Sequence, residues 1–517
     1  MKDERTRKAA LLLLALLLFV SSEAVLRIAG AGKTGDPDLV VVNPAAFFQT
    51  KRVNGNMVFA PGNDHAYAEG HPFYPVKKPP HTLRLFALGG SASGGWPHGP
   101  AQSYPSYLKR LLARALPQRE IEIINAGAHA YASYRLRIIF DDIFRFDPDV
   151  IVVYTGHNEF LEKRAYSNAS PAVTRLLKIA GYSRLFTTLR ARYRALQKGS
   201  ASLNEDLRPR FEESIVDKAQ RTALALRTDP AAYEDVVNHF RRTLAYMSER
   251  AEERGVPLIL VAPPSNIKDW EPNASTDASL PDSADALFSQ AKELDGLGRT
   301  EEARALYQQA KDADLNPFRA TSRLINAVRE IAASHRRTYL ADAETAFQKA
   351  ASGPAPGFDL FVDYVHPTPR ANALIARTVF NSVAEALSFT PVESGESELP
   401  FSEDEPEIDF TLFWLYAMMH QYDAVIRRAD VILKRLSRNP ALYERISTRP
   451  KILPPRPVDF VKNTREIFQD TAEIRRRERT KKPVSAKRKA DVLKRFQDFY
   501  KSEFNTSPYP KGWLKVQ

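Results

Sequence analysis

The chain has 517 residues, a formal net charge of +12 and no cysteine. Its length exceeds one ordinary hydrophobic core and predicts two or more folded units. A hydrophobic share of 44% and a charged share of 26% are those of a globular protein and exclude a largely disordered chain. The missing cysteine excludes disulfides, cysteine-containing zinc sites and a thiol nucleophile.

The first 29 residues predict export across a membrane. Four basic residues lie within Met1–Lys8, and an uncharged run follows from Ala9 to Ser22. The positive flank stays in the cytoplasm, so the rest of the chain is expected on the other side. Counted through Leu26, the apolar segment approaches the length of a spanning helix. We therefore predict a membrane signal anchor or, alternatively, a cleaved signal peptide.

A glycine- and proline-rich stretch over residues 30–80 predicts an extended linker or a strand-poor cap. Beyond it, apolar strand patterns alternate with helical ones through residues 81–390. The strand patterns cover 82–88, 121–124, 150–154, 257–262 and 338–341, and the helical ones 106–116, 134–146, 233–254, 323–334 and 371–387. This alternation predicts an α/β domain with a parallel sheet between two layers of helices. Its site is expected beyond the carboxyl ends of the strands.

Two insertions interrupt this domain. Residues 160–232 are polar and basic and predict a helical insertion. Residues 284–317 predict a helical hairpin whose small and aromatic residues resemble a tetratricopeptide repeat. The alternative is an ordinary alanine-rich hairpin. A lone repeat cannot bury its own apolar face, so we expect it to pack on the main domain.

Residues 391–517 predict a helical C-terminal extension with a basic tail. Between Thr471 and Arg495, 11 Lys and Arg oppose three acids, a net charge of +8. Such a run could contact anionic lipid or an acidic polysaccharide, and a solvated helix is the alternative. No nucleic-acid-binding fold accompanies the run, so we expect no nucleic-acid partner.

Candidate catalytic residues follow the first three strands. Ser91 comes after Gly89-Gly90 in the turn behind the first strand, where a hydroxyl would be exposed at the sheet edge. Gly127 ends the second strand, and its amide could face a developing oxyanion. Asn158 follows the third strand, where its side-chain amide could be a further donor. Each residue alone is compatible with a structural turn or a helix cap.

A candidate base precedes the last helix of the domain. The spacing of Asp363 and His366 lets the carboxylate accept from one imidazole nitrogen while the other faces Ser91. A surface turn with an incidental Asp–His pair is the alternative. His98, His129 and His157 lie near these loops, but they form no close ligand pair, so we predict no metal and no other cofactor.

The order of these motifs resembles that of the SGNH hydrolases, the GDSL-type esterases. The resemblance covers residues 82–390 and implies a flavodoxin-like three-layer αβα fold. It also implies Ser91 as nucleophile, His366 as base and Asp363 as its orienter. The amides of Ser91 and Gly127 and the side chain of Asn158 would form the oxyanion hole. The string GHNEF at 156–160 and Asn-Pro-Phe-Arg-Ala at 316–320 further resemble a membrane-anchored bacterial subgroup with a tetratricopeptide-like insertion.

The sequence departs from the family pattern at two positions. Gly90 stands in place of the Asp of the GDSL string, and Glu159 stands in place of the usual Asp after the third-block Asn. Neither change removes a group that acyl transfer needs, but both put a lipase-like specificity in doubt. Four residues become candidates for the substrate pocket, and one of them, Ser93, is also a rival nucleophile: Ser93, His157, Glu159 and Arg319.

The resemblance implies a serine esterase that works through an acyl-serine intermediate. With the predicted export segment, the expected substrates are acylated glycans, above all O-acetyl groups, or other small esters of the envelope or exterior. The expected location is the bacterial inner membrane with the catalytic domain facing the periplasm or the exterior, or secretion after signal cleavage. The alternatives are an O-acetyltransferase for an exported polysaccharide and a non-catalytic envelope scaffold.

Overall fold

The computed structural model contains two compact units. The smaller comprises Met1–Gln49 and Arg164–Arg210, and the larger comprises Thr50–Lys163 and Phe211–Gln517. The structure describes residues 19–27, 47–62, 73–161, 183–186, 188, 215–276, 280–391, 406–419, 421–438, 457–479, 485, 487–488, 490–492 and 494–495.

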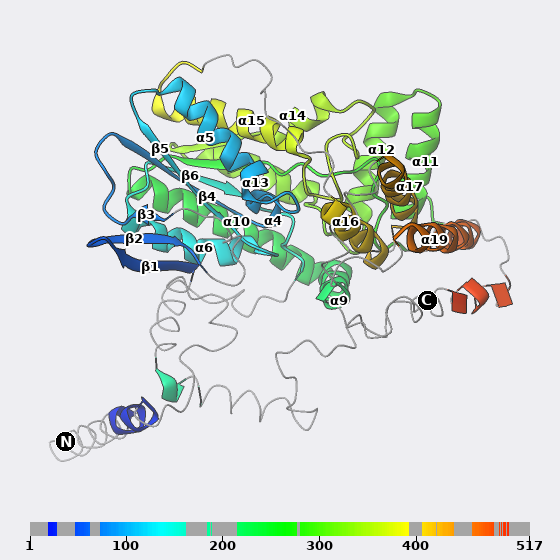
Figure 1. The fold of residues 1–517 in the computed structure, drawn as a ribbon, viewed down its shortest axis with the longest axis horizontal. Helices are drawn as coiled ribbons and strands as arrows, with labels where there is room; N and C mark the ends of the chain where they lie inside the picture. The colour runs from blue at the N-terminus through cyan, green and yellow to red at the C-terminus, as the bar shows by residue number, and fades with distance from the viewer. Residues whose placement is uncertain are drawn as a thin grey trace. The chain divides into compact units, whose positions relative to one another are not determined.

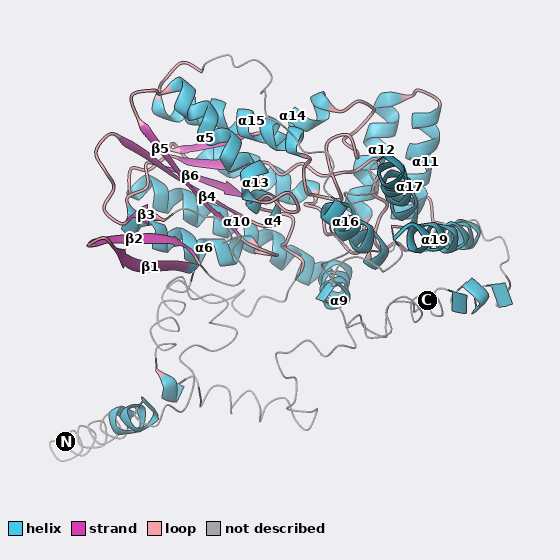
Figure 2. Ribbon diagram, in the orientation of Figure 1, coloured by secondary structure: helices cyan, strands magenta, loops and turns pink. Residues whose placement is uncertain are grey.

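Five parallel strands form the central sheet of the larger unit (Figures 1 and 2). They are β4 (Thr82–Gly89), β5 (Glu120–Gly127), β6 (Val150–Tyr154), β7 (Leu258–Val261) and β8 (Thr338–Ala341). Their order is β5-β4-β6-β7-β8, which is the doubly wound order of flavodoxin-like folds. Gly89 lies opposite both Gly127 and Tyr154, so the ends of three strands meet at one edge.

Helices cover both faces of this sheet. Helices α5 and α15 pack on one face, with α14 against α15, and α6, α10 and α13 lie on the other. The fold is therefore the predicted three-layer αβα arrangement. The helices have these bounds: α4 (Ser91–Gly94), η1 (Pro100–Gln102), α5 (Tyr104–Ala115), α6 (Ser133–Ile143), η2 (Phe144–Phe146), α10 (Pro230–Glu253), α13 (Ser322–Ser334), α14 (Ala343–Ala350) and α15 (Pro369–Leu387).

The longest helices begin where the sequence supplies both a cap and a proline. Asp229 accepts hydrogen bonds from the amides of Ala231 and Ala232 at the start of α10, and Pro230 occupies its first position. Thr368 caps α15 in the same way, and Pro369 follows it. A cap satisfies amides that have no partner within the helix, and proline loses nothing at the first position. The start of α15 fixes where the preceding loop, which carries Asp363 and His366, must end.

A small sheet precedes the main domain, where we expected an extended linker. It consists of β1 (Phe48–Val53), β2 (Asn56–Pro61) and β3 (Tyr74–Pro75). Asn54 and Gly55 connect β1 to β2 with φ angles of 49° and 82°. Positive φ at both central residues is the requirement of the tight hairpin turn that Asn-Gly favours. The Asn-Gly pair therefore outweighs the glycine and proline content that suggested a linker.

The described parts of the insertions and the extension are helical. They comprise α9 (Ile215–Thr228), the hairpin of α11 (Ala284–Gly296) and α12 (Thr300–Ala313), α16 (Pro406–Met418), α17 (Tyr422–Arg438) and α19 (Pro457–Arg479). Tyr307 and Phe288 pack edge to face between α11 and α12, with ring centroids 5.4 Å apart. These contacts fit the predicted hairpin, whereas its assignment as a tetratricopeptide repeat stays a prediction. The basic tail at 471–495 is only partly described, and most of insertion 160–232 lies outside the described residues.

In the smaller unit, the structure describes a helical stretch at 19–27. The Glu23 carboxylate accepts hydrogen bonds from Ser183 Oγ and from the amides of Arg184 and Leu185. Within the described residues, no helix has both the length and the apolar character needed to cross a membrane. Residues 1–18, which carry most of the predicted anchor, lie outside that part of the chain.

A buried arginine ties the small sheet to the main one. Arg84 on β4 is fully buried and pairs with Glu122 on β5 at 2.6 Å. Its guanidinium also donates to the carbonyl oxygens of Phe146 at 2.7 Å and Pro75 at 2.8 Å. These acceptors, a carboxylate and two carbonyl oxygens, offset the cost of removing the charge from water.

We predict that Arg84→Met destabilises the protein by about 3–5 kcal/mol, because Glu122 would remain as an uncompensated buried charge. Urea or guanidinium unfolding measures the change. Arg114→Met, on the exposed side of α5, is the control and should change stability by no more than about 0.5 kcal/mol. An equal effect of the two substitutions on the free energy of unfolding would show that the buried ion pair contributes no more to stability than an exposed arginine.

Candidate active site

Ser91, His366 and Asp363 form a continuous hydrogen-bonded chain at the carboxyl edge of the sheet. Ser91 Oγ lies 2.7 Å from His366 Nε2, and His366 Nδ1 lies 2.6 Å from Asp363 Oδ2. Since an ionised carboxylate only accepts, the imidazole donates from Nδ1 and accepts the serine proton at Nε2. Ser91 and His366 are 275 positions apart in sequence, and the fold brings their side chains into contact.

Local backbone geometry fixes each member of this chain. Ser91 is the first residue of α4, directly behind β4, so the helix itself does not use its amide. Asp363 is fully buried, and its other carboxylate oxygen accepts from the amides of Val365 and His366 at 2.8 Å each. These bonds orient the carboxylate toward the imidazole. They also leave the acid without contact with water.

Two aromatic rings lie against His366. The Trp96 ring centroid lies 4.4 Å from that of His366, and the Tyr364 ring lies edge-on at 5.9 Å. His98 is nearby on the same loop as Trp96, and neither of its buried ring nitrogens has a hydrogen-bond partner. Burial, reinforced by the charges of Arg428 and His366, lowers the pKa of His98 to about 4, so its imidazole is neutral at pH 7.

The C-terminal extension supports the loop that carries the acid and base. Tyr416 on α16 is buried, and its hydroxyl donates to the carbonyl of Val362, next to Asp363. Arg428 on α17 donates to Tyr416 Oη at 3.1 Å and to Asp409 at 2.9 Å. The extension is therefore part of the structural support of the site.

Asn158, one of the three predicted oxyanion donors, lies close to Gly90, the residue before Ser91. Its Nδ2 donates to the carbonyl of Tyr131 at 3.0 Å, which leaves its second amide hydrogen available. A Cβ at Gly90 would lie 2.6 Å from this nitrogen. Gly90, which replaces the Asp of the family pattern, therefore leaves the room that Asn158 needs.

Gly127 does not present a free amide. Its N–H donates to Asn125 Oδ1 at 3.0 Å, and a Cβ at this position would lie 2.3 Å from the backbone nitrogen of Gly94. Its glycine character thus serves the close approach of β5 to α4. The next loop holds Ala130 in the left-handed region at φ 56°, beside the Tyr131 that contacts Asn158.

The structure places all four residues predicted for the substrate pocket in buried positions. Ser93 faces Tyr104 Oη at 3.5 Å in the core, away from the chain of Ser91. Glu159 accepts from the amide and hydroxyl of Ser133 and so fixes the start of α6. Ser93 and Glu159 thus make these hydrogen bonds with buried residues of the domain.

His157 and Arg319 are also buried. His157 Nδ1 accepts from the amide of Ala320 at 3.2 Å, and burial lowers the pKa of His157 to about 3. Arg319 pairs with Asp314 at 3.3 Å in the interior. The sequence did not reveal this burial, because both residues lie in polar loops, which are usually exposed.

Comparison with known proteins bears on the identity of this domain. Residues 87–287 match the model of the GDSL-like Lipase/Acylhydrolase family. This segment of the chain is similar to that family. The match agrees with the prediction of a serine hydrolase that acts on esters. The matched region contains Ser91 and Asn158 and ends within the first turn of α11, whereas Asp363 and His366 lie beyond its end.

Solved structures with a similar chain trace include three bacterial or environmental enzymes. A lipase/acylhydrolase from Enterococcus faecalis is 14% identical and covers 60% of this chain and 100% of its own, with a TM-score of 0.31. Axe2, an acetylxylan esterase from Geobacillus stearothermophilus, is 14% identical, with coverages of 61% and 99% and a TM-score of 0.30. LAE5, an alpha/beta hydrolase from the Lake Arreo metagenome, is 15% identical, with coverages of 59% and 96% and a TM-score of 0.30. No curated protein matches the sequence.

We predict that Gly90→Ala lowers the kcat of the protein for an aryl acetate by roughly 10²–10³, the loss that follows removal of one oxyanion donor. The new Cβ would displace the Asn158 amide. Gly296→Ala is the control, since nothing lies within 4 Å of its Cβ position. A Gly90→Ala enzyme with wild-type kcat would show that Asn158 is not such a donor.

Proposed function

We propose that this protein is a serine esterase in which Ser91 is the nucleophile, His366 the general base and Asp363 its orienter. The hydrogen-bonded chain from Ser91 through His366 to Asp363 carries the proposal. Its distances lie within the range at which a nucleophile and its base exchange a proton. The buried Asp363 carboxylate faces the side of the imidazole that becomes positively charged during this step.

The reaction follows from this arrangement. Ser91 Oγ attacks the ester carbonyl carbon, and its proton passes to His366 Nε2. The carbonyl oxygen becomes an oxyanion, for which Asn158 Nδ2 and the amide of Ser91 are the candidate donors. Collapse expels the alcohol, which takes the proton from His366 and leaves an acyl-serine. Water then attacks this ester with His366 again as base, releasing the acid and restoring Ser91.

We predict that Ser91→Ala lowers the kcat for a short aryl acetate by at least roughly a thousandfold, because no other group can form the acyl-enzyme. The matched control is Ser93→Ala, two residues away in the same short helix, which removes a hydroxyl that faces Tyr104. Initial rates at saturating ester measure both variants. Loss of activity in Ser93→Ala with retention in Ser91→Ala would reverse the assignment.

For the natural substrate, the proposal is an O-acetyl ester on an envelope or extracellular glycan. It is supported by the export signal predicted from residues 1–29, since such esters lie outside the cytoplasm. The location in the inner membrane, or in the exterior after cleavage, stays a prediction from that segment.

Incubation with an O-acetylated polysaccharide should release free acetate at a rate well above that of the Ser91→Ala protein. Acetate measured enzymatically, together with the acetyl content of the polymer, gives the result. Movement of acetyl to a second sugar hydroxyl without release of acetate would identify a transferase. If the protein hydrolyses aryl acetate but not the acetylated polysaccharide, glycans are excluded as the substrate class, whereas the proposed role of Ser91 still stands.

A further inference from the structure

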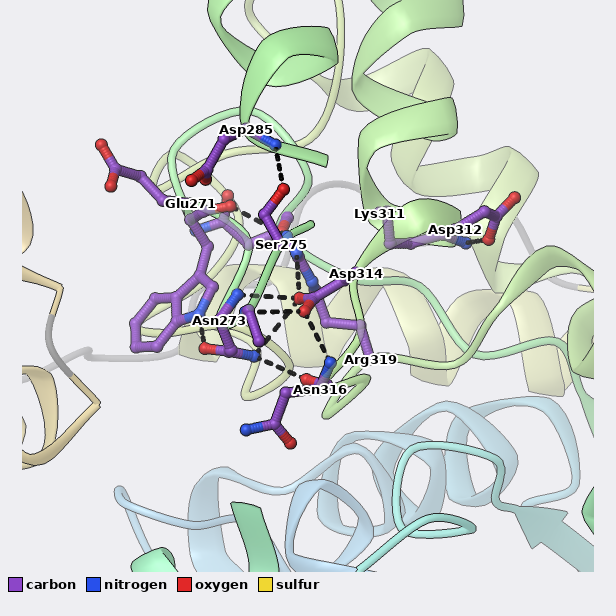
Figure 3. Close-up of polar contacts among 12 residues, drawn as sticks. Glu271, Asn273, Ser275, Asp285, Lys311, Asp312, Asp314, Asn316 and Arg319 are labelled. Atoms are coloured by element: carbon purple, nitrogen blue, oxygen red, sulfur yellow. Dashed lines mark hydrogen bonds and ion pairs between the residues drawn. The ribbon is translucent and has the colours of Figure 1, made fainter. Parts of the chain in front are cut away.

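A fully buried ion pair lies where the helical hairpin of α11 and α12 joins the catalytic domain. Asp314 and Arg319, 1% and 2% exposed, flank the turn between α12 and α13 and approach to 3.3 Å (Figure 3). Asp314 also accepts from the amides of Asn273, Ala274 and Asn316 at 2.9–3.0 Å. Burial raises the pKa of Asp314, and the charge of Arg319 acts in the opposite direction.

Arg319 reaches from this pair to the loop behind β7. Its Nη1 donates to the carbonyl oxygens of Asn266 at 3.0 Å and Trp270 at 2.9 Å. A guanidinium can hold two carbonyls and a carboxylate at once because its donors lie in a rigid planar fork, whereas an ammonium is a single point of donation. Arg319 therefore fixes the loop 266–270 at both of its ends.

The same loop holds the backbone of the catalytic acid. Asn266 is fully buried, and its Nδ2 donates to the carbonyl of Asp363 at 3.1 Å. Its own amide donates to the carbonyl of Tyr364 at 3.0 Å. Two successive peptide groups of the catalytic loop are thus attached to one residue, whose carbonyl is in turn held by Arg319.

The catalytic geometry is sensitive to this attachment. Asp363 Oδ2 accepts a hydrogen bond from His366 Nδ1 at 2.6 Å, and Asp363 Oδ1 accepts from two backbone amides. A shift of the Asp363 peptide would therefore turn the imidazole away from Ser91. Displacements of about 1 Å at a reacting group can cost roughly 10²-fold in rate.

We propose that Arg319 is a positioning residue for the esterase, acting through Asn266 to hold Asp363 and His366 in register with Ser91. The inference rests on the proposed function of the triad. It gives the connection between the helical hairpin and the domain a role in catalysis: the turn from α12 to α13 supplies Arg319 and its counter-ion Asp314.

The test compares Arg319→Lys with Asn266→Ala and with the double variant N266A/R319K in the full chain. Active sites are titrated with a fluorophosphonate probe, so that kcat is expressed per reactive Ser91 and not per mole of protein. Arg323→Lys is the matched control, since Arg323, four residues further along the chain on α13, forms an exposed ion pair with Glu234 on α10. Where Arg319→Lys does not fold, D314N/R319M removes both buried charges together.

We expect Arg319→Lys to lower kcat per titrated site by roughly tenfold to a hundredfold, with KM changed less than about twofold. Arg323→Lys should match the wild type. The double variant N266A/R319K should lose much less than the product of the two single losses, because both act on one connection.

A purely structural role of Arg319 would reduce the number of titrated sites and leave kcat per site unchanged, and that result overturns the proposal. Fully multiplicative losses in the double variant would likewise contradict a route through Asn266. If the wild-type chain neither labels nor hydrolyses esters, the proposed function fails and this inference fails with it. If the wild type is active and the variants equal it per site, the inference alone is wrong.

Discussion

The site depends on the imidazole of His366, which is hydrogen-bonded to Ser91 and to Asp363. These two partners come from opposite ends of the domain's sequence. Ser91 is fixed by the end of β4, and Asp363 is fixed by the loop before α15. His366 completes the chain only if both ends keep their place to within a few tenths of an ångström. This requirement explains why Asp363 is buried and why its carboxylate and both neighbouring peptide groups have hydrogen-bond partners.

The loop that carries Asp363 is supported by the C-terminal extension, by the loop behind β7 and by the turn between α12 and α13. Tyr416 and Arg428 of the C-terminal extension hold Val362 from one side, and Asn266 holds Asp363 from another. Asn266 is itself held by Arg319 beside the helical hairpin. The extension and the hairpin thus converge on the same few residues. Any additional binding role of these helices would have to be compatible with this structural one.

The parallel sheet and the edge that carries the site could be predicted from the sequence, because buried parallel strands appear as short apolar runs between helical patterns. Ser91, Asp363 and His366 could be predicted because their types and positions are constrained by the chemistry. The surroundings could not. Ser93, His157, Glu159 and Arg319 adjoin the motifs in sequence, yet the fold turns them into the interior. Likewise, Gly127 meets a packing constraint set by Gly94, a contact between distant segments that sequence spacing does not reveal.

The most direct test of this account is to locate the covalent adduct of the wild-type protein with a fluorophosphonate. Intact-mass measurement followed by peptide mapping identifies the modified residue. The account predicts one adduct per chain, on Ser91, formed at a rate that falls sharply in His366→Ala. An adduct on Ser93 or elsewhere, or ester hydrolysis by a chain whose Ser91 stays unmodified, would contradict it.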